Sequence, residues 1–127
     1  MEEGNCIFCD CQYNGLRVYP ITKFFFLKFD ACPVSKGHAL IIPKRHCKDI
    51  FELTHLEWED LRLAIHNAKT LIDYKHHPDG YNIGANCGAH AGQTIFHFHL
   101  HVIPRYKGDV ENPRGGVRNL KPPIIDY

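Results

Sequence analysis

The segment from Thr94 to Ile103 constrains this chain more than any other. Three of its residues, His97, His99 and His101, alternate with apolar neighbours. A period of two is the period of a β-strand, and it places all three imidazoles on one face, about 6.6 Å apart along the strand. Three imidazoles are costly to bury on a core face without partners. We therefore predict a strand over 94–103, with its apolar face on the core and its histidine face lining a site.

The rest of the pattern predicts an α+β fold. Thr54 is a candidate helix N-cap and Glu57, three residues later, completes a capping box. Apolar residues then recur at helical spacing up to about Tyr74, which predicts one long amphipathic helix. Further strands are predicted over Lys23–Phe29, His38–Ile42 and Tyr81–Ala85. An antiparallel sheet with one long helix follows from this order.

Length and composition limit the class of protein. A chain of 127 residues has the size of one domain, here 1–127, with 109–127 expected as an extended tail rich in Pro, Gly and charge. The formal net charge of +1, with no basic stripe, argues against a nucleic-acid partner. No apolar run approaches the roughly 20 residues of a membrane span. The acidic, polar start does not read as a secretory signal, so we expect a cytoplasmic protein with reduced thiols.

Two chemistries use a row of histidines. In one, imidazoles hold a metal ion that activates water. In the other, one imidazole attacks phosphorus, which is feasible near pH 7 because an unperturbed imidazole has a pKa of about 6.5. The approach to the strand favours phosphorus, because glycine backbone and amide or hydroxyl donors stabilise a phosphate anion. The candidate phosphate-binding residues are Asn86, Gly92, Gln93 and Thr94.

The sequence resembles the histidine triad (HIT) superfamily of nucleotide hydrolases and transferases. The His-x-His-x-His segment from His97 to Ile103 carries the signature, with Ala91-Gly92-Gln93-Thr94 before it and Pro104-Arg105 after it. The segment from Gly37 to His46 is also similar to the family. The resemblance covers the chain from Cys6 to about Asp109.

The resemblance implies roles for individual residues. His99 would be the nucleophile, its tautomer fixed by a backbone carbonyl, and His101 would bond the substrate phosphate. Asp30 would bind the ribose hydroxyls, and His38 would contact a triad histidine without touching the substrate. An apolar base pocket is expected from Ile7, Phe8, Phe29 and Ile41. Family members form two-fold dimers with a continuous sheet, so a homodimer is expected.

Two cysteines near the N-terminus, Cys6 and Cys9, form a Cys-x-x-Cys. A redox motif of this kind follows a strand and opens a helix, which this position does not favour. Family members that carry such a pair hold zinc with it, a histidine after the second strand and the first triad histidine. The corresponding set here is Cys6, Cys9, His46 and His97, a closed Cys₂His₂ set typical of one structural zinc ion per chain.

The expected function is nucleotidyl transfer to water through a covalent nucleotidyl-histidine intermediate. Transferase members of the family carry Gln at the third triad position, so the resemblance, with His101 there, disfavours a hexose-1-phosphate uridylyltransferase. Features around the triad resemble the fragile-histidine-triad branch, which predicts a diadenosine polyphosphate hydrolase acting on an adenine nucleotide. The alternatives are an adenosine phosphoramidase and a nucleotide-binding signalling protein with incidental turnover.

Overall fold

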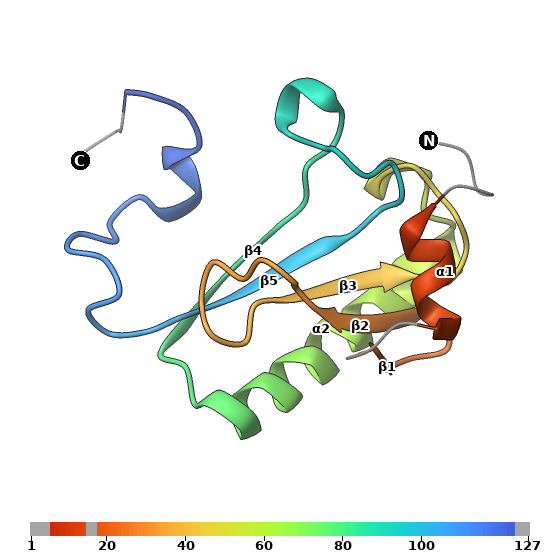
Figure 1. Cartoon of the computed structure of the whole chain (residues 1–127), viewed down its shortest axis with the longest axis horizontal. Helices are drawn as coiled ribbons and strands as arrows, with labels where there is room; N and C mark the ends of the chain where they lie inside the picture. The colour runs from red at the N-terminus through yellow and green to blue at the C-terminus, as the bar shows by residue number, and fades with distance from the viewer. Residues whose placement is uncertain (1–5, 15–17, 124–127) are drawn as a thin grey trace.

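A computed structural model describes residues 6–14 and 18–123 of the chain, and its centre is a five-stranded antiparallel sheet in the order β1-β2-β3-β5-β4 (Figure 1). The first five residues, which argued against a secretory signal, lie outside the described part. The strands are β1 (Val18–Pro20), β2 (Phe25–Phe29), β3 (Ala39–Pro43), β4 (Gly80–Gly84) and β5 (Leu100–Arg105). The α-helices are α1 (Ile7–Asn14) and α2 (His55–His76). The predicted α+β class, antiparallel sheet and long helix are confirmed.

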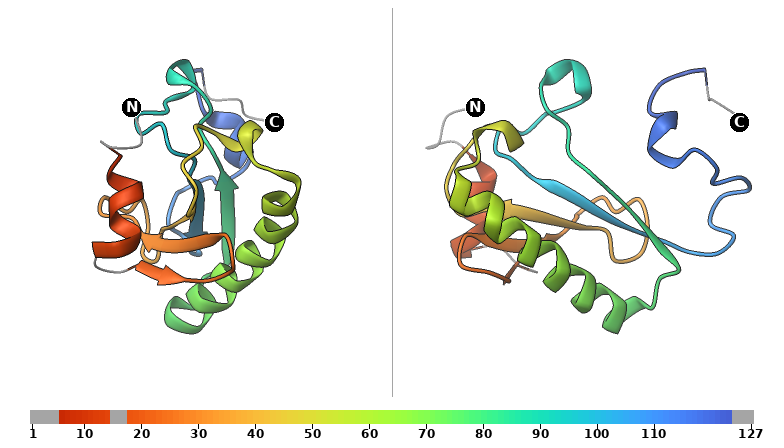
Figure 2. Two further views of the ribbon diagram at one scale, coloured as in Figure 1. Left: turned by 90° about the vertical axis from the view of Figure 1, so that its right-hand side faces the viewer. Right: turned by 180° about the vertical axis from the view of Figure 1, so that it is seen from behind.

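The two helices lie on opposite sides of the sheet (Figure 2). On the α2 side, Leu27, Ile41 and Leu100 are register partners on β2, β3 and β5, and they pack with buried helix residues such as Ala64 and Ala68. On the other side, Phe8 of α1 packs against Phe26, Leu40 and Ile42. Side chains alternate between the faces of a strand, so each of these strands contributes to both layers.

Helix α2 begins and ends as its sequence dictates. The Thr54 hydroxyl accepts from the Glu57 N–H at 3.1 Å, and the Glu57 carboxylate accepts from the Thr54 N–H at 2.8 Å, which completes the capping box. The helix ends where His77 adopts a left-handed conformation, φ 51°. The predicted helix is thus confirmed and runs two residues beyond Tyr74.

The histidine segment is a strand only in its second half. β5 begins at Leu100, whereas the sequence predicted a strand from Thr94, so that boundary was wrong. β3 and β5 pair only from Ala39 to Ile41, and the N–H of Phe98 instead donates to the carbonyl of Cys47 at 2.7 Å. The alternation nevertheless continues, because Phe98, like Leu100, packs on the α2 side.

The short elements α1 and β1 were not predicted. Beyond β5 the chain turns back on itself, where both oxygens of Asp109 accept from the guanidinium of Arg105 at 2.8 Å. A short 3₁₀ helix, η4 (Gly116–Asn119), follows in the described part of the tail. No helix in the described part of the chain is long and apolar enough to cross a membrane.

Candidate active site and metal centre

The ring of His99 has one nitrogen committed to the backbone. Its Nδ1 lies 2.9 Å from the carbonyl oxygen of His97. A carbonyl only accepts, so Nδ1 carries the proton, and in the neutral ring Nε2 keeps its lone pair. The ring lines a pocket of about 360 Å³ and meets the ring of Phe8 edge-on, with centroids 5.1 Å apart. His99 therefore presents an unprotonated ring nitrogen, which is the form a nucleophile requires.

His38 and His101 form a chain of directed hydrogen bonds. The Val34 N–H donates to His38 Nδ1 at 3.0 Å, so the proton of neutral His38 is on Nε2. His38 Nε2 lies 2.9 Å from His101 Nδ1, which must accept, and the proton of His101 is consequently on its Nε2. His38 is 3% exposed and is held by this chain. The arrangement leaves His101 as a hydrogen-bond donor in the pocket that His99 lines.

Burial keeps these imidazoles neutral. Desolvation, followed by the neighbouring His99 and His38, lowers the pKa of His101 to about 4. Desolvation also lowers the pKa of His38, although Asp30, whose carboxylate lies 3.5 Å from His38 Nε2, opposes this shift. At pH 7 both rings are therefore uncharged, which is the state the tautomer assignment assumes.

Three of the four phosphate-binding candidates line the His99 pocket. Asn86, Gly92 and Thr94 line it together with His99 and His101. Gly92 has φ 95°, a conformation that L side chains rarely adopt, and it lets the loop backbone run close to the pocket. These three residues line the same pocket as the ring of His99.

Gln93 is placed differently from the other candidates. Its side chain is 3% exposed and does not line the pocket. Its carbonyl oxygen accepts from the Gly88 N–H at 2.9 Å, and its amide donates to the carbonyls of Lys48 and Ile95 at 2.7 and 3.1 Å. Through these three hydrogen bonds the Gln93 side chain fixes the conformation of the loop, while its neighbours Gly92 and Thr94 line the pocket.

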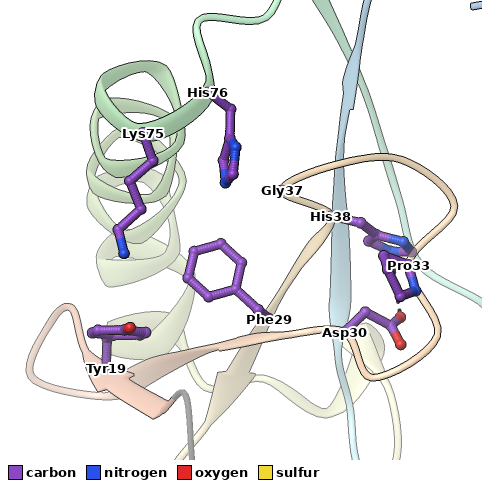
Figure 3. A pocket seen from close by; sticks show the side chains of 8 residues that line it. All are labelled: Tyr19, Phe29, Asp30, Pro33, Gly37, His38, Lys75 and His76. Carbon is purple, nitrogen blue, oxygen red and sulfur yellow. Dashed lines mark ion pairs between the residues drawn. The ribbon is translucent and has the colours of Figure 1, made fainter.

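Asp30 lies between two pockets. One carboxylate oxygen caps a turn by accepting from the Cys32 N–H at 2.9 Å, and the other faces His38. Asp30 lines the His99 pocket and also a second one of about 310 Å³ beside the end of α2. Figure 3 shows this second pocket, in which Phe29 points towards Lys75 of α2 and Asp30 points away, towards His38.

Two of the four expected base-pocket residues were assigned to the wrong face of the sheet. Phe29 and Ile41 pack in the core on the α2 side, away from His101. Their sequence neighbours Lys28 and Leu40 line the His99 pocket instead. Adjacent strand residues point to opposite faces, so a displacement of one position exchanges them. The other two candidates, on and beside the start of α1, do line the pocket; they are Ile7 and Phe8.

The four expected metal ligands converge beside this pocket. The Sγ atoms of Cys6 and Cys9 and the Nδ1 atoms of His46 and His97 all lie within 4.8 Å of one another. Three of these atom pairs are 3.2 Å apart: Cys6 Sγ and His97 Nδ1, Cys9 Sγ and His46 Nδ1, and the two Nδ1 atoms of His46 and His97. Cys9 Sγ lies 3.5 Å from His97 Nδ1. Ligand atoms of tetrahedral zinc lie about 3.3–3.8 Å apart, given Zn–N and Zn–S bonds of about 2.0 and 2.3 Å. The donor set and its spacing therefore fit a zinc ion.

The surrounding contacts orient these ligands. His97 Nε2 donates to the Pro43 carbonyl at 2.8 Å, which leaves Nδ1 facing the other three ligands. The loop that carries His46 is anchored by Arg45, whose guanidinium donates to both carboxylate oxygens of buried Glu57 at 3.1 and 2.8 Å. The Cys-x-x-Cys opens a helix, α1, and the residues before Cys6, where a redox motif would have its strand, lie outside the described part of the chain.

Comparison with known proteins identifies the family. The family model described as "HIT domain" matches residues 18–108, and the chain belongs to the HIT family. A HIT-like protein of Mycoplasma genitalium, itself uncharacterised, is 36% identical over 106 residues, which cover 82% of this chain and 75% of that one. A bis(5'-adenosyl)-triphosphatase of Dictyostelium discoideum is 35% identical over 96 residues, covering 76% of this chain and 64% of that protein.

The fold also matches solved structures of the family. A zinc-bound histidine triad family protein from Mycobacterium smegmatis superimposes with a TM-score of 0.74 and 31% sequence identity. The match covers 85% of this chain and 80% of that one. The sheet and long helix described above are therefore those of HIT-family structures.

Proposed function

We propose that this protein is a nucleotide hydrolase that cleaves a phosphoanhydride or phosphoramidate bond at the α-phosphorus of a nucleotide, with His99 as nucleophile. One observation carries the proposal: His99 Nδ1 is bonded to the His97 carbonyl, which leaves the Nε2 lone pair for the pocket. At the set that includes His97, the metal-water alternative is disfavoured because four protein ligands close the site, whereas catalytic zinc sites keep a position open. In the second group that could hold a metal, Asp30, His38 and His101, it is disfavoured because His38 Nε2 and His101 Nδ1 already share a hydrogen bond of 2.9 Å.

The reaction takes two displacements. In the first, the Nε2 lone pair of His99 forms an N–P bond while the bond from phosphorus to the leaving group breaks, and the leaving group takes that electron pair. The imidazolium so formed keeps its Nδ1–H on the His97 carbonyl, which stabilises the positive charge. In the second, the oxygen of a water molecule bonds to phosphorus, the N–P bond breaks and its electron pair returns to Nε2, which restores the neutral ring; one proton of the water passes through solvent to the released leaving group.

The remaining residues of the pocket stabilise charge on the phosphate. His101 donates from Nε2 to a phosphate oxygen, and the loop of Asn86, Gly92 and Thr94 supplies amide, backbone and hydroxyl donors. His38 holds the tautomer of His101 through the 2.9 Å hydrogen bond. In this proposal Asp30 accepts from the ribose, and Gln93 acts by bracing the loop.

Zinc is proposed as a structural ion. The residues that would hold it are Cys6, Cys9, His46 and His97, and the bound ion would supply a cross-link between α1, the loop after β3 and the catalytic segment. The zinc-bound relative from Mycobacterium smegmatis supports this assignment.

Assembly and location are proposed from the family. β4 lies at an edge of the sheet, and pairing of two β4 edges in a homodimer would give the continuous sheet expected from the sequence. Light scattering coupled to gel filtration tests the dimer. A cytoplasmic location stays a prediction.

The test of the function is capture of the intermediate. The protein is mixed with diadenosine triphosphate or adenosine 5'-phosphoramidate, quenched under non-acidic conditions and weighed intact, beside His99→Ala. The name of the Dictyostelium relative makes the first compound the reference substrate. A nucleotidyl adduct in the wild type and none in the variant is the expected result. Undiminished hydrolysis by His99→Ala would overturn the proposal, and the faster of the two substrates decides between hydrolase and phosphoramidase.

A further inference from the structure

The His99 pocket has a second end, which the proposed reaction does not use. The strand registers place Lys28 of β2, Leu40 of β3 and His101 of β5 in one row across the sheet, with Gly84 of β4 next. Neighbouring strands are about 4.8 Å apart, so the backbones of Lys28 and His101 are about 10 Å apart, with Leu40 between them. Both Lys28 and His101 line the pocket.

The two ends of this row have different chemistry. The phosphate donors Asn86, Gly92 and Thr94 come from the connection between β4 and β5, on the His101 side. On the other side, the residues of α1 and β3 beside Lys28 are mostly apolar, namely Ile7, Phe8 and Leu40, with the thiol of Cys11 among them. A nucleotide bound with its α-phosphorus at His99 consequently places its base among these apolar side chains, beside Lys28.

Lys28 brings a charge into that apolar end. Among the described residues that line the pocket, the other charged side chain is Asp30, and its carboxylate faces His38. The hydrogen bond described for Lys28 Nζ is a long one, 3.5 Å to the carbonyl of Phe29. An ammonium carries three N–H donors and no acceptor, so this end of the pocket supplies hydrogen-bond donors to a base.

We propose that Lys28 makes the pocket selective for nucleotides of 6-oxopurines, guanine or hypoxanthine, over adenine. This inference rests on the proposed function, because it requires the α-phosphate to lie at His99. Guanine presents two adjacent acceptors, O6 and N7, to a lysine, whereas adenine presents an amino donor in place of O6. The base preference of this chain then differs from the adenine expected from its relatives.

Substitution of Lys28 should also be able to reverse the preference between 6-oxopurines and adenine. A glutamine side chain both donates and accepts, and it pairs with the N6 and N7 atoms of adenine. Lys28→Gln should therefore shift the pocket towards adenine. Lys28→Met, which keeps the length of the side chain and removes its donors, should abolish the preference without favouring either base.

The first experiment measures binding by titration calorimetry. Wild type, Lys28→Met and Lys28→Gln are titrated with GMP, IMP and AMP, beside Lys23→Met, which removes an exposed lysine at the other end of the same segment. GMP and IMP are expected to bind the wild type and Lys23→Met at least about tenfold more tightly than AMP. The ratio should fall to near one in Lys28→Met and invert in Lys28→Gln. Circular dichroism confirms that each variant is folded.

The outcomes separate this inference from the proposed function. No preference in the wild type, or an equal loss for all three nucleotides in Lys28→Met, overturns the base contact, and the latter would assign Lys28 to phosphate. Turnover of diguanosine and diadenosine triphosphates is then compared. If neither these nor the corresponding nucleoside 5'-phosphoramidates are hydrolysed while GMP and IMP bind selectively, the hydrolase proposal falls and the role of Lys28 stands.

Discussion

His97 and His99 are two residues apart, carry the same side chain, and are prepared by the fold for different chemistry. The Nε2–H of His97 donates to the Pro43 carbonyl, and its Nδ1 faces two sulfurs and another imidazole. The Nδ1–H of His99 donates to the His97 carbonyl, and its Nε2 faces a pocket. Backbone carbonyls fix opposite tautomers in the two rings. The hydrogen bond made by one ring nitrogen thus decides which atom the other offers, and to what.

The residues around His97 are placed to stabilise the fold, whereas the residues around His99 are placed to carry out the reaction. The four candidate ligands, His97 among them, come from α1 and the residue before it, the loop after β3 and the segment before β5, so an ion there joins parts distant in sequence. The groups around His99 leave space for a ligand. Substitutions in the first set should change stability, and those in the second should change turnover.

The largest expected effect is on turnover, from removal of the nucleophile. His99→Gln should lower kcat by about 10⁴-fold or more, because no other pocket group replaces the attacking lone pair. Zinc content and melting temperature should change little. Steady-state kinetics, atomic absorption and thermal denaturation measure the three, with His66→Gln on the exposed face of α2 as control. Loss of zinc from His99→Gln together with the loss of turnover would contradict the separate roles given to His97 and His99.

The next effect is on stability. Cys9→Ser should release the zinc and lower the free energy of unfolding by more than about 3 kcal/mol, since the ion binds only the folded chain. Cys32→Ser, at an exposed thiol, is the matched control. Urea unfolding with and without a chelator measures the difference. If chelation leaves the wild-type unfolding curve where it was, the structural role of the metal is refuted.

Lowering the pH should reduce the free energy of unfolding, because burial disfavours the protonated form of His101 in the folded protein. Its pKa is about 4 in the folded protein, below the ordinary value of 6.5, so the unfolded chain takes up the proton first as pH falls. Its contribution is therefore complete above pH 6.5 and is lost towards pH 4, by up to about 3 kcal/mol. His101→Asn should flatten this part of the stability profile, measured by urea unfolding at constant zinc concentration. Identical profiles for the two proteins would contradict the assignment.

The smallest effect is expected from the residue behind His101. His38→Leu removes the donor that fixes the His101 tautomer and should lower kcat by about 10- to 100-fold, with a smaller change in KM. His38→Gln, which retains an N–H donor, should restore part of the rate. A loss confined to KM would place His38 in substrate binding instead of in positioning.

Much of the fold was predictable because its determinants are local. The capping box at Thr54 and the spacing of apolar residues set the limits of α2 to within about two residues. The alternation around His99 correctly separates imidazole from apolar neighbours, even where no strand forms. α1 and β1 are too short, at 8 and 3 residues, to leave a periodic signal.

The sequence by itself determined which side chains share a face of each element, because strand and helix periods act over a few residues. Only the tertiary structure decided which face meets the site. Whether Phe29 or Lys28 enters the pocket depends on how β2 pairs with β3, and a shift of one residue exchanges them. The tautomer of His97 likewise depends on Pro43, which is 54 residues away in the chain. Such contacts become defined only when the sheet has formed, because they join groups that no local pattern relates.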